Sequence, residues 1–224
     1  IALGVATFFS FTQFLSGHSS ADGVAVNQPA KLAAMEGHFE KNAPADLYLM
    51  GWVNKKDQTV TGIGIPGGLS FLVHQDFKAP IKGLNDFPEQ DRPSQINAVF
   101  QFYHIMVAIG LFLIALTFYA SFLWFKGKLF ETKWLLTIFS YSVLLPQIAN
   151  QVGWFTAEMG RQPWVVYGQL RTSQAFSQEV SANQIVFSLV LFTLVYSLLL
   201  VLFLYSVNKK VKHGPYDSSD AVLN

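Results

Sequence analysis

The feature that most constrains this chain is its long apolar runs. Three of them approach the roughly 20 residues that a helix needs to cross a bilayer, namely Ala98–Phe125, Trp134–Trp154 and Ile185–Val207. Charged residues make up only 13% of the chain, whereas an average soluble domain has about a quarter. The apolar residues are bunched rather than spread at the period of an amphipathic element. The sequence therefore predicts an all-α integral membrane protein embedded in a lipid bilayer.

The arrangement of the runs predicts a transmembrane helix bundle with one partial and three full spans. Residues 1–15 are apolar but too short to cross a bilayer, so we expect a partial transmembrane helix whose start lies upstream, in a fragment or a split subunit. Residues 16–94 are polar and predict a long loop without a span of its own. Residues 95–207 would hold the three full spans, and residues 208–224 a tail.

The positions of basic residues predict the orientation of the spans. Lysines in the tight link between the first two spans and after the last span are Lys126, Lys128, Lys133, Lys209, Lys210 and Lys212. Short basic segments favour the cytoplasmic side, which places loop 16–94 and loop 155–184 outside the cell membrane and the tail in the cytoplasm. The net charge of +1 gives no field that would recruit nucleic acid.

The absence of cysteine limits the possible metal chemistry. With no Cys in 224 residues, the chain has no disulfide, no thiolate-bound iron–sulfur cluster and no covalently attached c-type haem. Any metal bound here would need His, Met or carboxylate ligands.

The sharpest group of polar residues lies at the outer end of the second predicted span, in GWFTAEMGRQPW, residues 153–164. If the helix continues, Trp154 and Glu158 share a face, and Arg161 follows Glu158 by three residues. A carboxylate near hydrocarbon is costly and usually marks a functional site. The alternative is a structural Glu158–Arg161 pair that closes the helix, with Trp154 as an interfacial residue.

Two further segments carry candidate residues. The first, NQPAKLAAMEGHF at residues 27–39, holds Lys31 and Glu36; taken alone, it is an ordinary amphipathic helix with a solvated lysine and glutamate. The second, FQFYHIMVAIG at residues 100–110, holds His104 and Met106. A buried Met usually fills space and a lone His is usually a satisfied polar group. Because His104 and Met106 are two residues apart, their side chains point to different helix faces and cannot both bind one iron.

Together these three segments resemble subunit I of cytochrome bd-type quinol oxidases. Their order and orientation resemble those of the C-terminal half of that subunit, in the form with a short Q loop. The resemblance implies that Met106 is an axial ligand of low-spin haem b iron. It implies that Glu158 ligates or attends the iron of high-spin haem b, with Trp154 and Arg161 nearby. His104 stands where some members carry an Arg near the low-spin haem.

The resemblance also implies a function for loop 16–94, the Q loop of this family. Lys31 and Glu36 would bind and oxidise quinol, because a cation can hydrogen-bond a quinone oxygen and a carboxylate can accept a quinol proton. Electrons would pass through low-spin haem b to high-spin haem b and haem d, where O2 is reduced to water. The expected partners are the N-terminal half of subunit I, subunit II and small single-span subunits, in a bacterial or archaeal cytoplasmic membrane.

Two other classes of protein stay open at this point. One is a quinone-reactive b-type cytochrome that anchors a dehydrogenase, a class that needs His pairs within its spans, whereas here only His104 is near a span. The other is a non-catalytic structural subunit of the oxidase. The sequence also leaves open whether ubiquinol or menaquinol is the substrate, and what His104 does.

Overall fold

The structure is a computed structural model that describes residues 1–177 and 179–214 and divides into a unit over Ile1–Ala175 and a second that begins at Phe176. Its helices are α1 (Ala2–Asn27), α2 (Pro29–Glu36), α3 (Gly68–His74), α4 (Ile96–Phe125), α5 (Lys133–Ser142), α6 (Leu145–Gly160) and α7 (Ala182–His213). Its strands are β1 (Leu47–Asn54), β2 (Thr59–Ile65), β3 (Trp164–Val166) and β4 (Leu170–Arg171).

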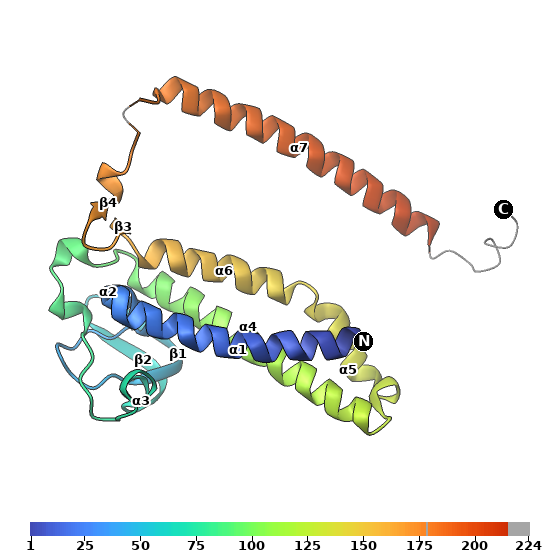
Figure 1. Cartoon of the computed structure of the whole chain (residues 1–224), viewed down its shortest axis with the longest axis horizontal. Helices are drawn as coiled ribbons and strands as arrows, with labels where there is room; N and C mark the ends of the chain where they lie inside the picture. The colour runs from blue at the N-terminus through green and yellow to red at the C-terminus, as the bar shows by residue number, and fades with distance from the viewer. Residues whose placement is uncertain (178, 215–224) are drawn as a thin grey trace, which may run out of the picture. The chain divides into compact units, whose positions relative to one another are not determined.

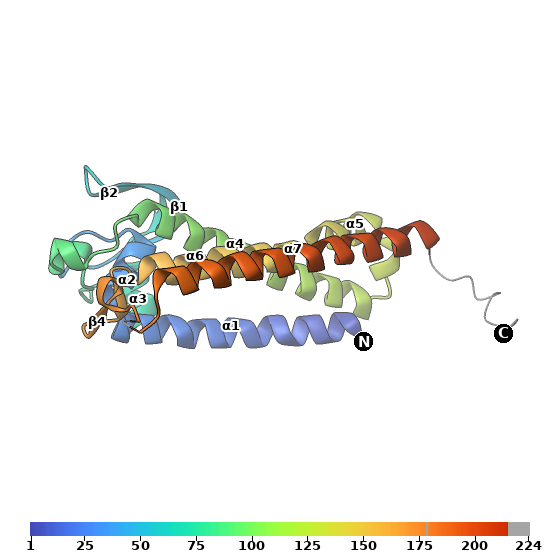
Figure 2. The same cartoon turned by 90° about the horizontal axis from the view of Figure 1, so that it is seen from above.

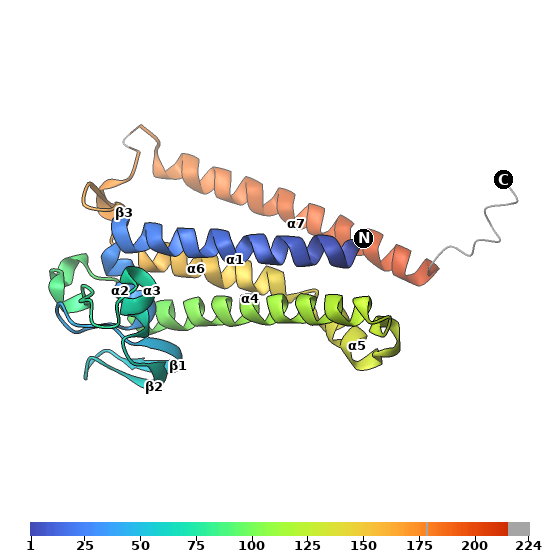
Figure 3. The same cartoon turned by 60° about the horizontal axis from the view of Figure 1, so that its bottom comes forward.

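Three helices run side by side in the first unit, with α4 packed on both α1 and α6 (Figures 1 and 3). The smaller elements α2, α3 and the strands gather at one end of these helices, while the chain start and α5 lie at the other (Figure 1). Figure 2 shows α1 extending from the chain start to the end where α2 lies. The polar loop and the C-terminal end of α6 therefore meet at one end of the unit.

The first helix is longer than its apolar run predicts. We expected it to end at residue 15, but α1 continues to Asn27. Residues 16–27 are polar and contain no proline, and polarity alone does not end a helix. The helix ends at Gln28, which has φ −140° and ψ 60°, because Pro29 disfavours helical backbone in the residue before it.

The second predicted span is not one helix. The expected span Trp134–Trp154 is divided into α5 and α6, with a turn at Val143 and Leu144. Pro146 lies in the first turn of α6, where its missing N–H is harmless, whereas in a continuous helix it would remove one hydrogen bond and clash with the preceding turn. The sequence prediction overlooked this proline.

The all-α prediction is wrong in detail, because the loops contain two small antiparallel hairpins. Strand β1 pairs with β2, with Leu47 opposite Ile65 and Asn54 opposite Thr59, and β3 pairs with β4. The first hairpin is rich in β-branched and aromatic residues, which favour strands. At its turn, Oδ1 of Asn54 accepts a hydrogen bond of 3.0 Å from the backbone N–H of Lys56, as Asn does in turns.

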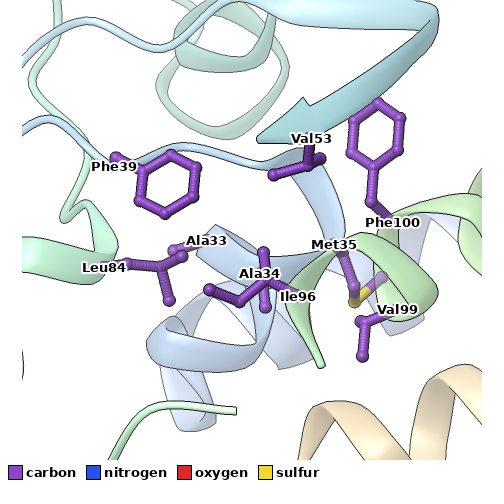
Figure 4. Packing of buried hydrophobic residues seen from close by; sticks show 9 residues of the cluster. All are labelled: Ala33, Ala34, Met35, Phe39, Val53, Leu84, Ile96, Val99 and Phe100. Atoms are coloured by element: carbon purple, nitrogen blue, oxygen red, sulfur yellow. The ribbon is translucent and has the colours of Figure 1, made fainter. Parts of the chain in front are cut away.

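A buried apolar cluster fixes α2 to the start of α4 and to the β1–β2 hairpin (Figure 4). Its members are Ala33, Ala34, Met35, Phe39, Val53, Leu84, Ile96, Val99 and Phe100. Figure 4 shows Ala34 and Met35 of α2 near Ile96 and Val99 of α4, below Phe39 and Val53, with Phe100 of α4 beside Val53. A second cluster joins Leu116, Ala120 and Leu123 of α4 to Leu129 and Leu135 at the opposite end. Helix α4 therefore carries both cores.

Among the described residues, two helices are long and apolar enough to cross a membrane, one over Glu89–Phe125, which includes α4, and the other α7. The second unit is dominated by α7, which extends beyond the predicted span Ile185–Val207 at both ends and takes in the basic residues up to His213. Of the predicted tail, residues 215–224 lie outside the described residues. The described part is thus a mostly helical membrane protein with two candidate spans.

Gly37 provides a test of how tightly α2 is held against the hairpin. It ends α2 with φ 65°, and an added Cβ atom would lie 2.7 Å from Cγ2 of Val60. Gly127 has a similar φ of 71° but has no heavy atom within 4 Å of an added Cβ. We expect Gly127→Ala to cost about 1 kcal/mol through backbone strain alone. Gly37→Ala should cost a further ~1–3 kcal/mol through overpacking. Thermal unfolding of the purified complex measures the stability lost in each variant. Equal losses in Gly37→Ala and Gly127→Ala would show that the β1–β2 hairpin moves aside without cost.

Candidate functional site

The Glu158–Arg161 pair lies where α6 ends. Helix α6 continues through Glu158 as expected and ends at Gly160, with Arg161 next. Nη2 and Nε of Arg161 donate to Oε2 of Glu158 at 2.5 and 3.2 Å, and Nη1 donates to the backbone oxygen of Val165 at 3.3 Å. Both side-chain bonds fall on one carboxylate oxygen, and within residues 1–177 and 179–214 no side chain is found bonded to Oε1. One oxygen of Glu158 is therefore held and the other is open.

Lys31 joins this pair from the polar loop. Helix α2 packs against α6, and an added Cβ on Gly160 would lie 3.1 Å from Cγ of Lys31 and 3.3 Å from Cγ1 of Val99. Burial lowers the pKa of Lys31, the nearby Arg161 lowers it further, and Glu158 acts in the opposite direction. Residues that the sequence predicts as two separate sites thus form one charged cluster, made of Lys31, Glu158 and Arg161.

A small cavity of about 10 Å³ lies beside this cluster, enough for about one water molecule. It is lined by Lys31 and Arg161, by Gln28 before α2, and by Asp91 and Tyr167. The side chain of Gln28 contributes a buried Oε1 without a hydrogen-bond partner among the described residues. Ala30, Pro93 and Val165 also line the cavity, so its wall is mixed polar and apolar, and it lies where α2 meets the end of α6.

The segment after α6 is anchored by residues that the sequence did not single out for this role. Arg171 of β4 forms an ion pair with Asp91 and donates to the backbone oxygen of Gln90 at 3.3 Å. Its guanidinium also lies 4.5 Å from the ring centroid of Trp164, a favourable cation–π arrangement. Because Asp91 belongs to the polar loop, this contact fastens the loop to the β3–β4 hairpin. No sequence spacing connects two residues so far apart.

Glu36 is not the solvated residue of an ordinary amphipathic helix. Its side chain is buried, with 1% of the residue exposed, and Oε2 has no hydrogen-bond partner among the described residues. Burial raises the pKa of Glu36 to about 8, and the hydroxyl of Tyr103 on α4 opposes that shift by hydrogen bonding. Burying an acid with an unpaired oxygen costs folding free energy. Such strained acids are often found at functional sites.

Met106 and His104 face different parts of the protein. An added Cβ on Gly153 of α6 would lie 2.7 Å from Sδ of Met106, so the thioether sits against bare α6 backbone. His104 faces the polar loop, with Nε2 2.8 Å from the backbone oxygen of Tyr48 and its ring stacked on Phe100 at 3.9 Å. His104 therefore ties β1 to α4, while Met106 belongs to the α4–α6 contact.

Trp154 also lies outside the charged cluster. It is 55% exposed on α6, and its ring packs at 5.4 Å from that of Phe155. It shares α6 with Glu158, as the sequence predicts, but its indole makes no hydrogen bond within the described residues. Its exposed indole resembles the aromatic residues that line membrane proteins.

The fold and this site define a helical membrane protein with a charged cluster at one end of its bundle. The family described as cytochrome bd terminal oxidase subunit I matches residues 1–215. The chain therefore belongs to the cytochrome bd oxidase subunit I family, which confirms the resemblance seen in its motifs.

Individual relatives of this chain belong to the same family. The chain is 34% identical to a putative cytochrome bd menaquinol oxidase subunit I of Bacillus subtilis, over 97% of this chain and 48% of that protein. It is 31% identical to a cytochrome bd ubiquinol oxidase subunit 1 of the same organism, over 89% and 45%. The bd oxidase structure from Geobacillus thermodenitrificans matches with a TM-score of 0.74 and 32% identity, over 95% of this chain and 48% of that one. The chain thus spans about half the length of the relatives it matches.

The charged cluster can be tested through the reactivity of the Lys31 amine. Arg161 lowers the pKa of Lys31 and Glu158 raises it. We therefore expect Arg161→Gln to raise this pKa and slow amine labelling at mildly alkaline pH, and Glu158→Gln to lower it and speed labelling. Mass spectrometry of the labelled complex measures the rates, with the exposed Lys41 as an internal reference. Changes of the same sign in both variants would contradict the arrangement.

Proposed function

We propose that this chain is part of subunit I of a cytochrome bd-type terminal oxidase, which oxidises quinol at the outer membrane face and passes electrons through b-type haems to haem d for reduction of O2 to water. The observation that carries this proposal is the contact of Lys31 with the Glu158–Arg161 end of α6. It brings Lys31, which is proposed to bind quinol, beside Glu158 and Arg161, which are proposed to attend a haem. Membership of the bd oxidase subunit I family supports the same function.

The side chains present fit a haem protein. The open Oε1 of Glu158 could supply a carboxylate donor to a haem iron, and the thioether of Met106, which lies against Gly153, could supply a sulfur donor. Within the described residues there is no cluster of three or more His, Asp or Glu side chains that could hold a bare metal ion. We propose Met106 as a ligand of low-spin haem b iron and Glu158 as a ligand of high-spin haem b iron. When bound, the haems supply electron transfer and oxygen chemistry.

The protein groups have separate tasks in this proposal. Lys31, half buried beside Arg161 and with a lowered pKa, donates a hydrogen bond to a quinone oxygen. Glu36 accepts a quinol proton. Arg161 fixes the carboxylate of Glu158 and offsets its charge. His104 holds the β1 strand of the Q loop on α4 through Tyr48. Trp154 lies among the high-spin haems.

The proposed membrane arrangement rests on which residues lie at the two ends of the first unit. The link between α4 and α5, which contains Lys126 and Lys128, lies at the opposite end from α2 (Figure 1). We propose that the lysine end faces the cytoplasm and the Q loop faces outward. We also propose that this Q loop is of the short form.

The proposed assembly includes further chains. Ligands for the remaining axial positions would come from the N-terminal half of subunit I. Subunit II and small single-span subunits would complete the oxidase in a bacterial or archaeal cytoplasmic membrane. Both ubiquinol and menaquinol occur in the names of the relatives, and the chain is compatible with either.

The ligand role of Met106 has a direct spectroscopic test. Met106→Leu keeps a similar volume, so we expect the complex to assemble but to lose the low-spin haem b signal, or to show a lowered potential for that haem, because Met ligation raises it. Met159→Leu is the matched control, since Met159 packs against the apolar cluster without a proposed ligand role. A reduced-minus-oxidised spectrum unchanged in Met106→Leu would remove Met106 from the ligands.

The role of Glu158 is separated from simple charge pairing by a double variant. If Glu158 is an iron ligand, the Glu158→Ala complex should lose the high-spin haem b and its oxygen consumption while it retains the low-spin signal. Were the pair only structural, replacing both Glu158 and Arg161 by neutral residues would recover most of the loss, because neither charge is left unpaired. We expect no recovery of oxygen uptake in membranes supplied with quinol. A double variant with three haems and normal uptake would defeat the ligand role.

A further inference from the structure

The β3–β4 hairpin is bonded directly to the end of α6 that carries Arg161. The backbone N–H of Trp164 donates to the backbone oxygen of Arg161 at 3.0 Å, and Nη1 of Arg161 donates to that of Val165 at 3.3 Å. In the hairpin, Trp164 lies opposite Arg171. The backbone of Arg171 is therefore fixed, through a few hydrogen bonds, relative to the Glu158–Arg161 pair.

Arg171 reaches from this hairpin to the polar loop and holds an acid there. Its guanidinium pairs with Oδ1 of Asp91, donates to the backbone oxygen of Gln90 at 3.3 Å and lies 4.5 Å from the ring centroid of Trp164. The side chains of Arg171 and Asp91 are only 29% and 19% exposed, so this is not a loose surface pair. Without the guanidinium, a largely buried carboxylate would lack its cation, which is unfavourable.

The nearest alternative cations for Asp91 lie in the wall of the cavity described above. Asp91 lines this cavity together with Lys31 and Arg161. Arg161 is already bonded to Glu158, whereas within the described part of the chain the amine of Lys31 has no ion-pair partner. A carboxylate released from Arg171 would therefore find Lys31 as the unpaired cation of the same cavity.

We propose that Arg171 is a positioning residue of the quinol site, which binds the carboxylate of Asp91 and so leaves the amine of Lys31 free for a quinol oxygen. This inference rests on the proposed function. With Asp91 bound to Arg171, the charged groups that act on the pKa of Lys31 are Arg161 and Glu158, and Asp91 is not among them. Without Arg171, quinol would first have to displace a carboxylate from the amine.

The kinetic test compares single and double variants of the assembled oxidase. We expect Arg171→Gln to raise the KM for quinol about tenfold with little change in kcat, because Asp91 then competes with quinol for Lys31. Adding Asp91→Asn removes the competing charge, so the double variant should recover most of the wild-type KM. A hairpin that was merely loosened would not be repaired, since the double variant lacks the same ion pair.

Amine labelling supplies a readout that does not involve quinol. Pairing with Asp91 would raise the pKa of Lys31. We therefore expect Lys31 to react more slowly at mildly alkaline pH in Arg171→Gln than in the wild-type complex, and to regain its rate when Asp91→Asn is added. Mass spectrometry measures the rates, with the exposed Lys41 as an internal reference.

Arg92→Gln is the matched control, because Arg92 follows Asp91 in the loop but bonds neutral groups. Its Nε donates to the backbone oxygen of Phe87 at 2.8 Å, and its Nη1 donates to Oδ1 of Asn85 at 3.2 Å. Loss of these bonds loosens the loop without releasing a carboxylate, so the KM and the labelling rate of Lys31 should stay close to those of the wild type.

A conservative variant keeps the test decisive if Arg171→Gln does not assemble. Arg171→Lys retains the positive charge but loses the planar fork that meets both Asp91 and the indole of Trp164. We expect a smaller rise in KM than in Arg171→Gln, and Asp91→Asn should again relieve it.

The outcomes separate this inference from the proposed function. The role of Arg171 would be overturned by a normal KM in Arg171→Gln, by a raised KM that Asp91→Asn does not relieve, or by an unaltered labelling rate of Lys31. In each of these cases Lys31→Ala would still oxidise quinol slowly. Normal quinol oxidation by Lys31→Ala would instead remove Lys31 from the proposed quinol site, and the role of Arg171 would fail with it.

Discussion

The close contact between α4 and α6 is the interaction on which the rest of the site depends. It is possible because glycine occupies two positions of α6, where Gly153 faces the sulfur of Met106 and Gly160 faces Lys31 and Val99. Small residues allow helix backbones to approach closely in membranes, where no hydrophobic force drives helices together. This approach sets the thioether of Met106 against the middle of α6 and lets Lys31 of the polar loop reach the end of α6 that carries Glu158.

Local features of the structure were predictable from the sequence, and long-range features were not. The Glu158–Arg161 pair is three residues apart on a helix, so helical geometry alone predicts it. The apolar runs likewise predict α4 and α7. Lys31 and Glu158 are brought together only by tertiary packing, and a single sequence contains no signal of that proximity. The same is true of Arg171 with Asp91 and of Tyr103 with Glu36.

The structure differs from the predicted fold for one physical reason. Prolines and strand-forming residues set the ends of these elements, and average hydropathy does not report either. The polar residues 16–27 remain helical because the first helix breaker is the proline at position 29. The apolar run 134–154 does not form one helix because Pro146 interrupts it. The β1–β2 hairpin was missed because its strands lie in a loop that is rich in glycine and polar residues, although their aromatic and β-branched residues favour pairing.

The way Arg161 holds Glu158 has a consequence for redox behaviour. Two guanidinium hydrogen bonds fall on a single oxygen of the carboxylate, so part of its negative charge is already neutralised. A carboxylate in that state stabilises ferric iron less than a free carboxylate does, because the ferric form gains most from a full negative charge. If Glu158 held a haem iron as proposed, the guanidinium would make that iron easier to reduce, and Lys31 would add a further positive charge nearby. The same cations that orient the carboxylate would then also raise the reduction potential of the iron.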